Sequence, residues 1–424
     1  MGTCGKRAAT WRFGASLAAV VGLALATLPL AAGCGPATAA AAAPSSPPHG
    51  IEPGTRFTPL AASLLTTPMA VEGTDGKLHL AYELELTNAI LAQVDVQRVD
   101  VLDGSGNVLL SLEGDALRAA IVPLGTPPPA EGDVQTGPTT LPASSSSVVW
   151  LDVQLPAGTP APASLQHRVT VSIGGTTAAL DGMAPVRTAP GPPVVLGPPV
   201  RPGIWYASDG CCSRPTHHRR GLAPVNGTLM VPQRFAVDWF MLDSQHRAWE
   251  GDPSKLSSYM SFEQPVIASA DAQVVDVQDG LPDNGSLPDP PPIPPIENTV
   301  GNHVILKVRD GLYLLYAHLE HGTVDVHEGQ TVRRGQVLGK IGSSGNSTTP
   351  HLHFQVMTTA TFFPTDSPPF VFDRFQLLGT ITDRIWDDNL GLQPNGTLPF
   401  QAAPRPGRRT DEMPLDRDVV RFEG

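Results

Sequence analysis

The 424-residue chain has few basic residues, few aromatic residues and only four cysteines. Its 28 lysines and arginines are outnumbered by 40 acidic residues, which gives a formal net charge of −12. This balance argues against a nucleic-acid-binding protein, because phosphate contacts require a basic face. No collagen period or heptad array is visible, which excludes the fibrous classes. What the chain does have is length for two or three domains, and proline and glycine make up about a fifth of it.

The first 33 residues have the pattern of a secretory signal peptide. Three basic residues precede an apolar run from 13 to 32, and the segment contains no acidic residue. A basic region followed by an apolar region is typical of an export signal. A membrane-spanning helix is the alternative, because the run is about 20 residues long. Pro29 and Gly33 favour cleavage, so we predict a signal peptide over 1–33.

The end of the apolar run resembles a bacterial lipobox, in which a cysteine after a small residue is lipidated and becomes the mature N-terminus. The segment 30–34 reads Leu-Ala-Ala-Gly-Cys, with Ala31 where lipoboxes favour leucine. Lipidation at Cys34 and ordinary cleavage within 37–43 are both open. Both place the protein outside the cytoplasm: in the periplasm, at the outer membrane or cell surface as a lipoprotein, or outside the cell. Residues 34–54, rich in Ala, Pro and Ser, are predicted to be a tether.

Two further cysteines, Cys211 and Cys212, are adjacent in the sequence. An oxidising compartment permits disulfides, although a bridge between neighbours closes a strained ring. A vicinal disulfide, an intermolecular bridge and two free thiols are all open. A separate metal site with His217 and His218 is disfavoured, because adjacent cysteines lack the C-x-x-C separation.

Residues 55–183 show the alternation of apolar and polar residues that is typical of antiparallel strands. Several short strands without helices predict an immunoglobulin-like β-sandwich. We expect no catalytic site in this domain, and we expect His79 and His167 to be surface residues. The expected strands are 78–86, 94–102, 108–112, 148–155 and 168–173.

A second all-β domain is predicted over 204–400, after a proline-rich linker at 184–203. Within this domain, residues 281–298 contain seven prolines and are predicted to form a loop beside the sheet, because proline lacks the donor that a central strand needs. Residues 401–424 are predicted to be a surface strap or a disordered tail. The expected strands are 266–268, 273–277, 303–308, 312–317, 337–339 and 351–356.

The segment 350–356, Pro-His-Leu-His-Phe-Gln-Val, carries the clearest chemical signal. Residues i and i+2 of a strand point to the same face, so His351 and His353 project together. One neutral imidazole can coordinate zinc while the other transfers a proton. Upstream, His318 ends another expected strand, and the glycines of 335–345 suit the turns that lead to the paired histidines.

Five segments together closely resemble the lysostaphin/LytM-type zinc endopeptidases of bacterial cell walls, over about 265–358. The resemblance implies catalytic roles for His318 and His351, and a zinc-binding role for His353. It also implies a small antiparallel β-fold, Zn²⁺ as cofactor and peptidoglycan as substrate. The segments are Gly-Asn-His-Val (301–304), Tyr-Ala-His-Leu (316–319), Val-Arg-Arg-Gly-Gln (332–336), Gly-Ser-Ser-Gly-Asn-Ser (342–347) and His-Leu-His-Phe (351–354).

The remaining ligands of that family come from an H-x-x-x-D segment, which here reads Arg-Phe-Ala-Val-Asp (234–238). Asp238 fits the carboxylate ligand, whereas Arg234 is always cationic and cannot bind zinc. Three alternatives follow. A histidine from 216–220, with His218 as the candidate, takes the vacant position; or zinc is held by Asp238, His353 and one further residue; or Arg234 pairs with Asp238 and no metal binds.

Two functions from different classes are therefore open. The first is an exported or lipid-anchored zinc metalloendopeptidase that hydrolyses peptide bonds in peptidoglycan, with the sandwich as a spacer or wall-binding module. The second is an inactive family member that binds peptidoglycan or activates a partner hydrolase, which Arg234 favours. A glycan- or partner-binding role of the sandwich itself has no residue-level support. His303, His321 and His327 are expected to be solvated.

Overall fold

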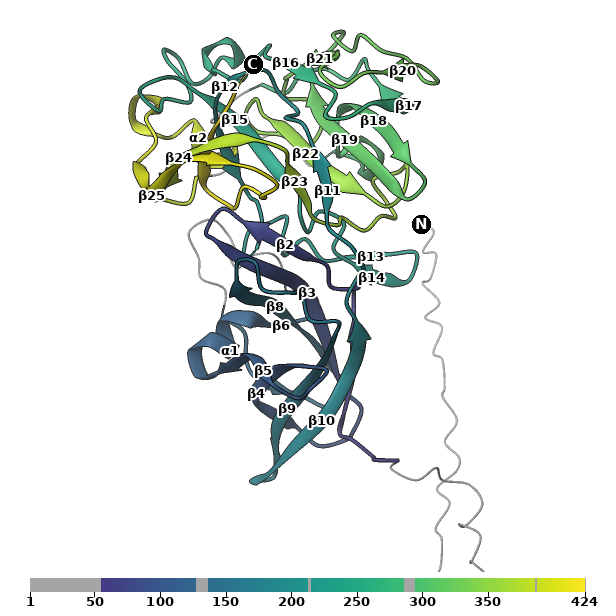
Figure 1. Ribbon diagram of the computed structural model, residues 1–424. Helices are drawn as coiled ribbons and strands as arrows, with labels where there is room; N and C mark the ends of the chain where they lie inside the picture. Colours follow the sequence, from purple (N-terminus) through teal and green to yellow (C-terminus); the bar gives the residue numbers. More distant parts are fainter. Residues whose placement is uncertain (1–54, 127–135, 213–214, 286–293, 386, 424) are drawn as a thin grey trace, which may run out of the picture. The chain divides into compact units, whose positions relative to one another are not determined.

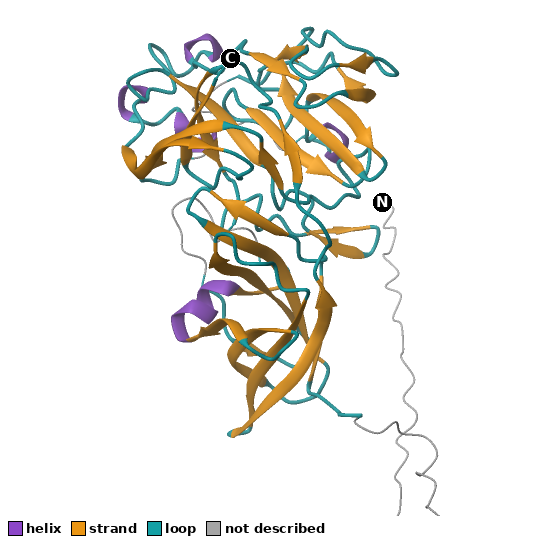
Figure 2. Ribbon diagram, viewed as in Figure 1, coloured by secondary structure: helices purple, strands orange, loops and turns teal. Residues whose placement is uncertain are grey.

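The computed structural model describes residues 55–126, 136–212, 215–285, 294–385 and 387–423 (Figure 1). The predicted signal peptide, tether and lipidation site at Cys34 lie outside the described residues. From Phe57 onward the chain clusters into one compact unit. Strands and loops make up nearly all of it (Figure 2), so the all-β prediction is confirmed. Among the described residues, no helix has the length and apolar character needed to cross a membrane.

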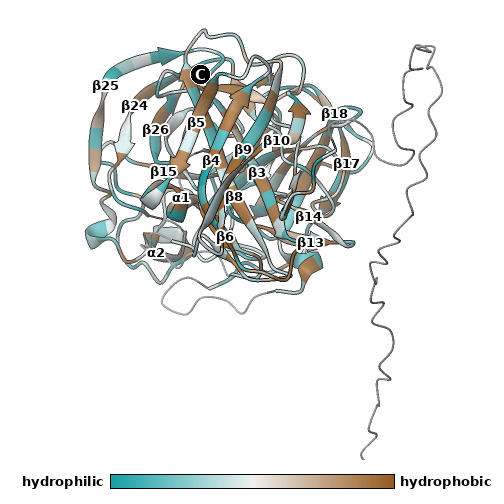
Figure 3. Cartoon of the chain, turned by 90° about the horizontal axis from the view of Figure 1, so that it is seen from below, coloured by the Kyte–Doolittle hydropathy of each residue, from teal (hydrophilic) through white to brown (hydrophobic). Residues whose placement is uncertain are grey.

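The first part of this unit is a β-sandwich of two five-stranded antiparallel sheets. Apolar and polar residues alternate along its strands (Figure 3), and the apolar sides from both sheets share one core that includes Leu84, Val99, Val149 and Val169. The prediction of an immunoglobulin-like topology stays a prediction. The strands are β1 (Leu60–Leu64), β2 (Ala70–Gly73), β3 (Lys77–Asn88), β4 (Val94–Asp103), β5 (Val108–Glu113), β6 (Ile121–Pro123), β7 (Thr140–Leu141), β8 (Ser146–Pro156), β9 (Ser164–Ile173) and β10 (Thr176–Arg187), with one helix, α1 (Gly114–Ala120).

In one sheet the strands run in the order β1-β3-β8-β6, with β2 also paired to β3. In the other the order is β10-β9-β4-β5, with β7 also paired to β4. All five strands predicted for this domain are present. The strand β10 extends past the predicted boundary at 183, because its pairing with β9 continues to Arg187.

The second part is centred on a ten-stranded sheet in the order β20-β17-β18-β19-β22-β15-β12-β26-β24-β25, in which every pair is antiparallel. Smaller sheets pair β11 with β23, β13 with β14, and β16 with β21. The strands are β11 (Val194–Leu196), β12 (Gly203–Ser208), β13 (Ala223–Val225), β14 (Thr228–Met230), β15 (Val237–Leu242), β16 (Pro265–Ile267), β17 (Ala272–Gln278), β18 (Asn302–Arg309), β19 (Leu312–Leu319), β20 (Thr331–Val332), β21 (Val337–Lys340), β22 (Leu352–Met357), β23 (Phe370–Phe372), β24 (Phe375–Ile381), β25 (Phe400–Arg409) and β26 (Asp418–Phe422), and a short helix α2 spans Asp387–Leu390.

The six strands predicted for this domain are all present, but two other predictions are wrong. Residues 401–424 are not a strap or a disordered tail, because 400–409 and 418–422 form β25 and β26 of the main sheet. Residues 184–203 are not only a linker, because Val194–Leu196 pairs in parallel with β23. In both cases proline-containing sequence hid strands whose pairing partners are distant in the chain.

The histidines of the sandwich are buried, so their prediction as surface residues is wrong. His167 is fully buried, and its Nε2 lies 2.9 Å from the Tyr82 hydroxyl. His79 is 1% exposed, with Nδ1 3.0 Å from Asp152 Oδ2 and Nε2 3.1 Å from Asp75 Oδ1. Burial opposes the charged form of His79, but its hydrogen bonds to Asp152 and Asp75 outweigh burial and raise its pKa to about 9.

This histidine is expected to make stability depend on pH. The pKa of His79 in the fold, about 9, lies above the unfolded value of 6.5. Protonated His79 therefore stabilises the fold fully below pH 6.5, and this contribution is lost as pH rises through 9. We expect the free energy of unfolding to fall by roughly 3 kcal/mol between these limits. Urea unfolding measured at several pH values across this range should show this fall in the free energy of unfolding in the parent protein and a smaller fall in His79→Gln. An equal fall in both proteins would contradict the assignment.

Cys211 and Cys212 form a vicinal disulfide. Both are buried, and the Cys211 carbonyl accepts a hydrogen bond from the amide of Asp416 at 2.9 Å. Of the three alternatives left open by the sequence, the structure contains the vicinal disulfide. The Cys212 sulfur also lies near His79 and Asp152, but a disulfide sulfur is not a thiolate ligand.

Candidate active site

Three adjacent strands of the main sheet, β19, β22 and β15, bring the predicted site residues together (Figure 1). His353 on β22 is directly opposite Asp238 on β15. On its other side it is opposite Ala317 on β19, the residue before His318. His351 immediately precedes β22. Strand pairing therefore gathers residues that lie more than 100 positions apart in the chain.

The carboxylate of Asp238 is the centre of the cluster. Its Oδ1 lies 2.9 Å from His353 Nδ1 and 3.6 Å from His351 Nε2, and its Oδ2 lies 3.5 Å from His218 Nε2. None of these four residues is more than 2% exposed. The ring of His318 lies 4.8 Å from that of His351, between centroids. The arrangement is a buried, polar centre of one acid and four imidazoles.

Hydrogen bonds to the main chain determine which ring nitrogen faces this centre. A carbonyl oxygen can only accept, so a ring nitrogen bonded to it must carry the proton. In three of the histidines that nitrogen is Nδ1, so Nε2 is the nitrogen without a proton when the ring is neutral. The bonds run from His218 to the Asp209 carbonyl (3.2 Å), from His318 to Ser344 (2.8 Å) and from His351 to Thr349 (2.9 Å).

In His353 the two ring nitrogens have the opposite roles. The Gln355 amide nitrogen donates to the Pro232 carbonyl at 3.1 Å, so the Gln355 oxygen faces His353 Nε2 at 2.9 Å. Nε2 must then carry a proton, and in the neutral ring Nδ1, which faces Asp238 Oδ1, has none. Two acceptors at 2.9 Å need a cation or a proton between them. Imidazole nitrogen and carboxylate oxygen are the donors that zinc prefers, so this set fits Zn²⁺.

The electrostatics of the centre favour the metal-binding protonation states. Burial lowers the pKa of His218 and His318 well below the ordinary value, and neighbouring histidines lower it further. Burial alone would raise the pKa of Asp238, but His218, His351 and His353 hold it well below its usual range. Neutral imidazoles and an ionised carboxylate are the forms that bind a metal.

Arg234 points away from this centre. It is 1% exposed, and its guanidinium donates to Glu83, from Nε to Oε1 at 2.9 Å and from Nη2 to Oε2 at 2.7 Å. It also pairs with Asp366. The alternative in which Arg234 pairs with Asp238 is therefore wrong. The structure places His218 beside Asp238 and His353, the position that the first alternative expects.

His217 lies close to the same centre. Ligand atoms of His217, His218 and Asp238 all lie within 4.8 Å of one another. The Nδ1 of His217, however, faces Asp209 Oδ1 at 3.1 Å, and its side chain is 39% exposed. His218 is thus the better placed of the two histidines.

The described residues of the proline-rich loop lie beside the turn that leads to His351, as predicted. Asn284 donates to the carbonyls of Gly345 (2.7 Å) and Ser347 (3.0 Å). The facing residue Gly301 has φ +63°, and a Cβ there would lie 2.4 Å from the Ser344 carbonyl oxygen. Glycine is required at this position because that carbonyl accepts the His318 hydrogen bond.

The sequence mispredicted one further histidine of this domain and did not indicate Gln355. His303 is buried, not solvated, with Nδ1 2.8 Å from the Gly301 carbonyl and Nε2 3.1 Å from Asp276. His321 and His327 are exposed, as expected. Gln355 was missed, although its place two residues after His353 on one strand face was a usable signal.

A family comparison adds to this geometry. Residues 257–363 match the model of Peptidase family M23. The match includes His318, His351 and His353, while His218 and Asp238 lie before it. This region of the C-terminal domain belongs to the family, which supports the resemblance to lysostaphin/LytM-type peptidases. The matched region thus carries three of the four histidines of the cluster; the second part of the described unit, from β11 onward, is called the M23 domain.

Individual relatives resemble short parts of the chain. The glycyl-glycine endopeptidase ALE-1 of Staphylococcus capitis is 42% identical over 73 residues, 17% of this chain and 20% of that protein. The DD-carboxypeptidase/endopeptidase Mpg of Neisseria meningitidis is 46% identical over 55 residues, 13% of this chain and 12% of that protein. The chain therefore spans a fifth or less of the length of these relatives. The solved catalytic domain of lysostaphin from Staphylococcus simulans is 23% identical, covering 40% of this chain and 89% of that one, with a TM-score of 0.22.

Proposed function

We propose that the protein is an exported zinc metalloendopeptidase that hydrolyses peptide bonds in bacterial peptidoglycan. The observation that carries the proposal is the set of unprotonated ring nitrogens directed at one buried carboxylate, Asp238. We assign His218, Asp238 and His353 as the zinc ligands, with His318 and His351 as the catalytic residues. Membership of the M23 family and the endopeptidase names of its relatives support peptide hydrolysis.

The chain's own residues can perform the proton transfers that such hydrolysis needs. Zinc, when bound, would polarise the scissile carbonyl and activate a water molecule. His318 and His351 each have Nδ1–H committed to a carbonyl, so Nε2 is the atom that can accept and return a proton. Gln355 keeps Nδ1 of His353 free for the metal.

Export and membrane attachment form part of the same proposal. Their support is the signal-like segment 1–33 and the lipobox-like segment that ends at Cys34. The inactive alternative, in which the protein binds peptidoglycan or activates a partner hydrolase, depended on Arg234 as a lost ligand. Arg234 binds Glu83, and His218 lies beside Asp238. The inactive alternative therefore no longer has a missing ligand to support it.

The proposal is tested by metal content and hydrolysis together. Purified mature protein is expected to hold about one zinc per chain and to release fragments from isolated peptidoglycan. A chelator should stop the release, and added zinc should restore it. His353→Ala should lose both properties, whereas His321→Ala, an exposed histidine outside the cluster, should keep them. Folded parent protein that holds no zinc and is inert on several peptidoglycan types would overturn the proposal.

A further inference from the structure

One carboxylate of the sandwich, that of Glu83 on β3, is fully buried and binds two arginines of the M23 domain. Arg219 directly follows His218, and Arg234 begins the segment that ends at Asp238. Arg234 forms a two-pronged contact with Glu83, and Arg219 donates to Glu83 Oε1 from Nη1. The sandwich therefore contacts both segments that supply the assigned ligands upstream of the matched family region.

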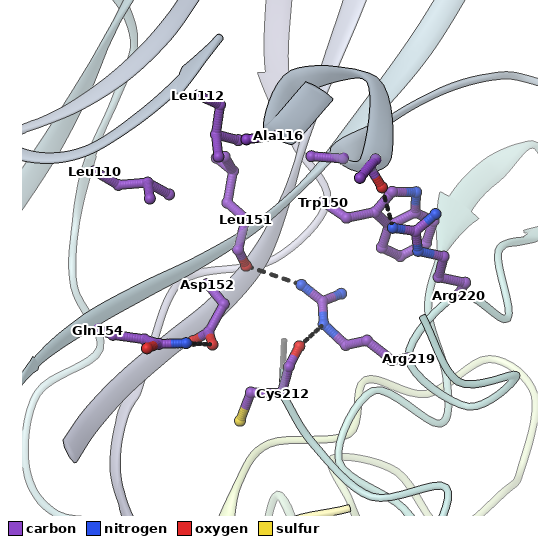
Figure 4. A pocket seen from close by; sticks show the side chains of 12 residues that line it. Leu110, Leu112, Ala116, Trp150, Leu151, Asp152, Gln154, Cys212, Arg219 and Arg220 are labelled. Atoms are coloured by element: carbon purple, nitrogen blue, oxygen red, sulfur yellow. Dashed lines mark hydrogen bonds between the residues drawn. The ribbon is translucent and has the colours of Figure 1, made fainter. Parts of the chain in front are cut away.

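Arg219 is fixed on all sides. Its Nη2 donates to the carbonyls of Leu151 (2.9 Å) on β8 and Tyr82 (3.1 Å) on β3. Its Nε donates to the Cys212 carbonyl at 3.3 Å. Figure 4 shows the guanidinium between the Leu151 and Cys212 carbonyls. Because these partners come from two sandwich strands and the disulfide segment, Arg219 cannot turn away without leaving buried carbonyls unpaired.

The turn at 216–220 links the position of Arg219 to the position of His218. Thr216 accepts hydrogen bonds from the amides of Arg219 (3.1 Å, at Oγ1) and Arg220 (2.9 Å, at the carbonyl). Within this tight turn, Arg219 reaches Glu83 while its neighbour His218 reaches Asp238. The position of the imidazole thus depends on where the guanidinium is held.

Arg234 constrains the second segment in the same way. Its further ion pair is with Asp366, which also accepts a hydrogen bond from Thr66 of the sandwich at 2.5 Å. Pro232, two residues before Arg234, provides the carbonyl that orients Gln355, the partner of His353. Buried charges of this kind hold their geometry because unpairing one of them is costly.

We propose that Glu83 is a positioning residue of the M23 site, which makes the sandwich an integral part of the metal centre. The inference rests on the proposed function and deepens it. It replaces the expectation of a separate spacer or wall-binding module. Glu83 touches neither metal nor substrate; it acts through Arg219 and Arg234 on His218 and Asp238.

The test compares zinc affinity in full-length variants. Glu83→Gln keeps the size of the side chain and removes its charge. Glu85→Gln is the matched control, because Glu85 lies two residues along β3 and contacts Ser63 outside the site. Competition with a chromophoric chelator should show zinc binding weakened by about 10- to 100-fold in Glu83→Gln, the range for residues that orient metal ligands. Glu85→Gln should stay within about twofold of the parent protein.

A readout specific to the site separates positioning from general stability. Cobalt-substituted Glu83→Gln should show an altered visible absorption spectrum, because the ligand geometry around the metal changes. If Glu83→Gln does not fold, Arg219→Lys carries the test: lysine keeps the charge but lacks the planar fork that spans Glu83 and the carbonyls. It should weaken zinc binding to a similar degree.

The outcomes distinguish this inference from the proposed function. Weaker zinc binding and a changed cobalt spectrum, with the control unaffected, support the positioning role. A folded variant with the zinc affinity and cobalt spectrum of the parent overturns it, even if its melting temperature falls, and leaves the proposed function standing. A parent protein that binds no zinc overturns both.

Discussion

His218→Ala is expected to lose its zinc and, with it, all hydrolysis of peptidoglycan. The side chain is buried, its Nδ1 is committed to the Asp209 carbonyl, and its Nε2 faces Asp238. Removing one of the three assigned protein ligands leaves two, and a water molecule would have to take the vacated coordination position. Zinc sites with four protein ligands bind with about 10 to 16 kcal/mol, so one ligand contributes roughly 3 kcal/mol, or about a hundredfold in affinity. Metal analysis after dialysis and a chelator competition assay measure the loss.

The control for this prediction is His217→Ala. His217 is the neighbouring histidine, but its Nδ1 faces Asp209 and its side chain is partly exposed. We expect this variant to keep its zinc and most of its activity. The reverse result, with zinc lost in His217→Ala and kept in His218→Ala, would show that the wrong histidine of the pair has been assigned.

His318→Ala and His351→Ala are expected to keep zinc and to lose hydrolysis. Both histidines present an unprotonated Nε2 beside the centre, while the assigned ligands are other residues. General acid–base catalysis contributes about 10² to 10⁴ in rate, so kcat/KM on isolated muropeptides should fall by about that factor. Zinc content should stay near that of the parent protein.

The two variants also separate catalysis from metal binding within the H-x-H pair. His353→Ala should lose zinc, whereas His351→Ala should not, although both side chains lie within 4 Å of Asp238. Equal loss of zinc from both variants would make His351 a ligand and leave His318 as the single catalytic histidine. His321→Ala again provides the histidine control at an exposed position.

The site residues that lie in regular strands could be predicted from the sequence. The alternation in 351–356 puts His351 and His353 on one side, and the strand that contains His318 pairs beside them. His218 could be given only as one of three alternatives. It comes from an irregular turn whose path is set by contacts with Glu83 and the disulfide segment, and no local pattern encodes such contacts.

Glu83 shows why the rest of the site was not predictable. In the segment Tyr-Glu-Leu-Glu-Leu (82–86), the two glutamates alternate with apolar residues, as on the solvent side of a strand. Glu85 follows that expectation, but Glu83 is fully buried. Its arginine partners lie 136 and 151 residues away in the chain. Only the packing of the second part against the first distinguishes the two glutamates.

The position of β26 has a consequence for how the domain assembles. β26 lies inside the main sheet, between β12 and β24, and β12 in turn pairs with β15 through Ser208 and Asp238. Until residues 418–422 have been synthesised, β12 and β24 have no strand to join them. The ten-stranded sheet that carries Asp238 is therefore completed only after these residues have been made. Contacts between segments this far apart slow folding, so the last step in completing this sheet depends on a strand that lies more than 200 residues after β12.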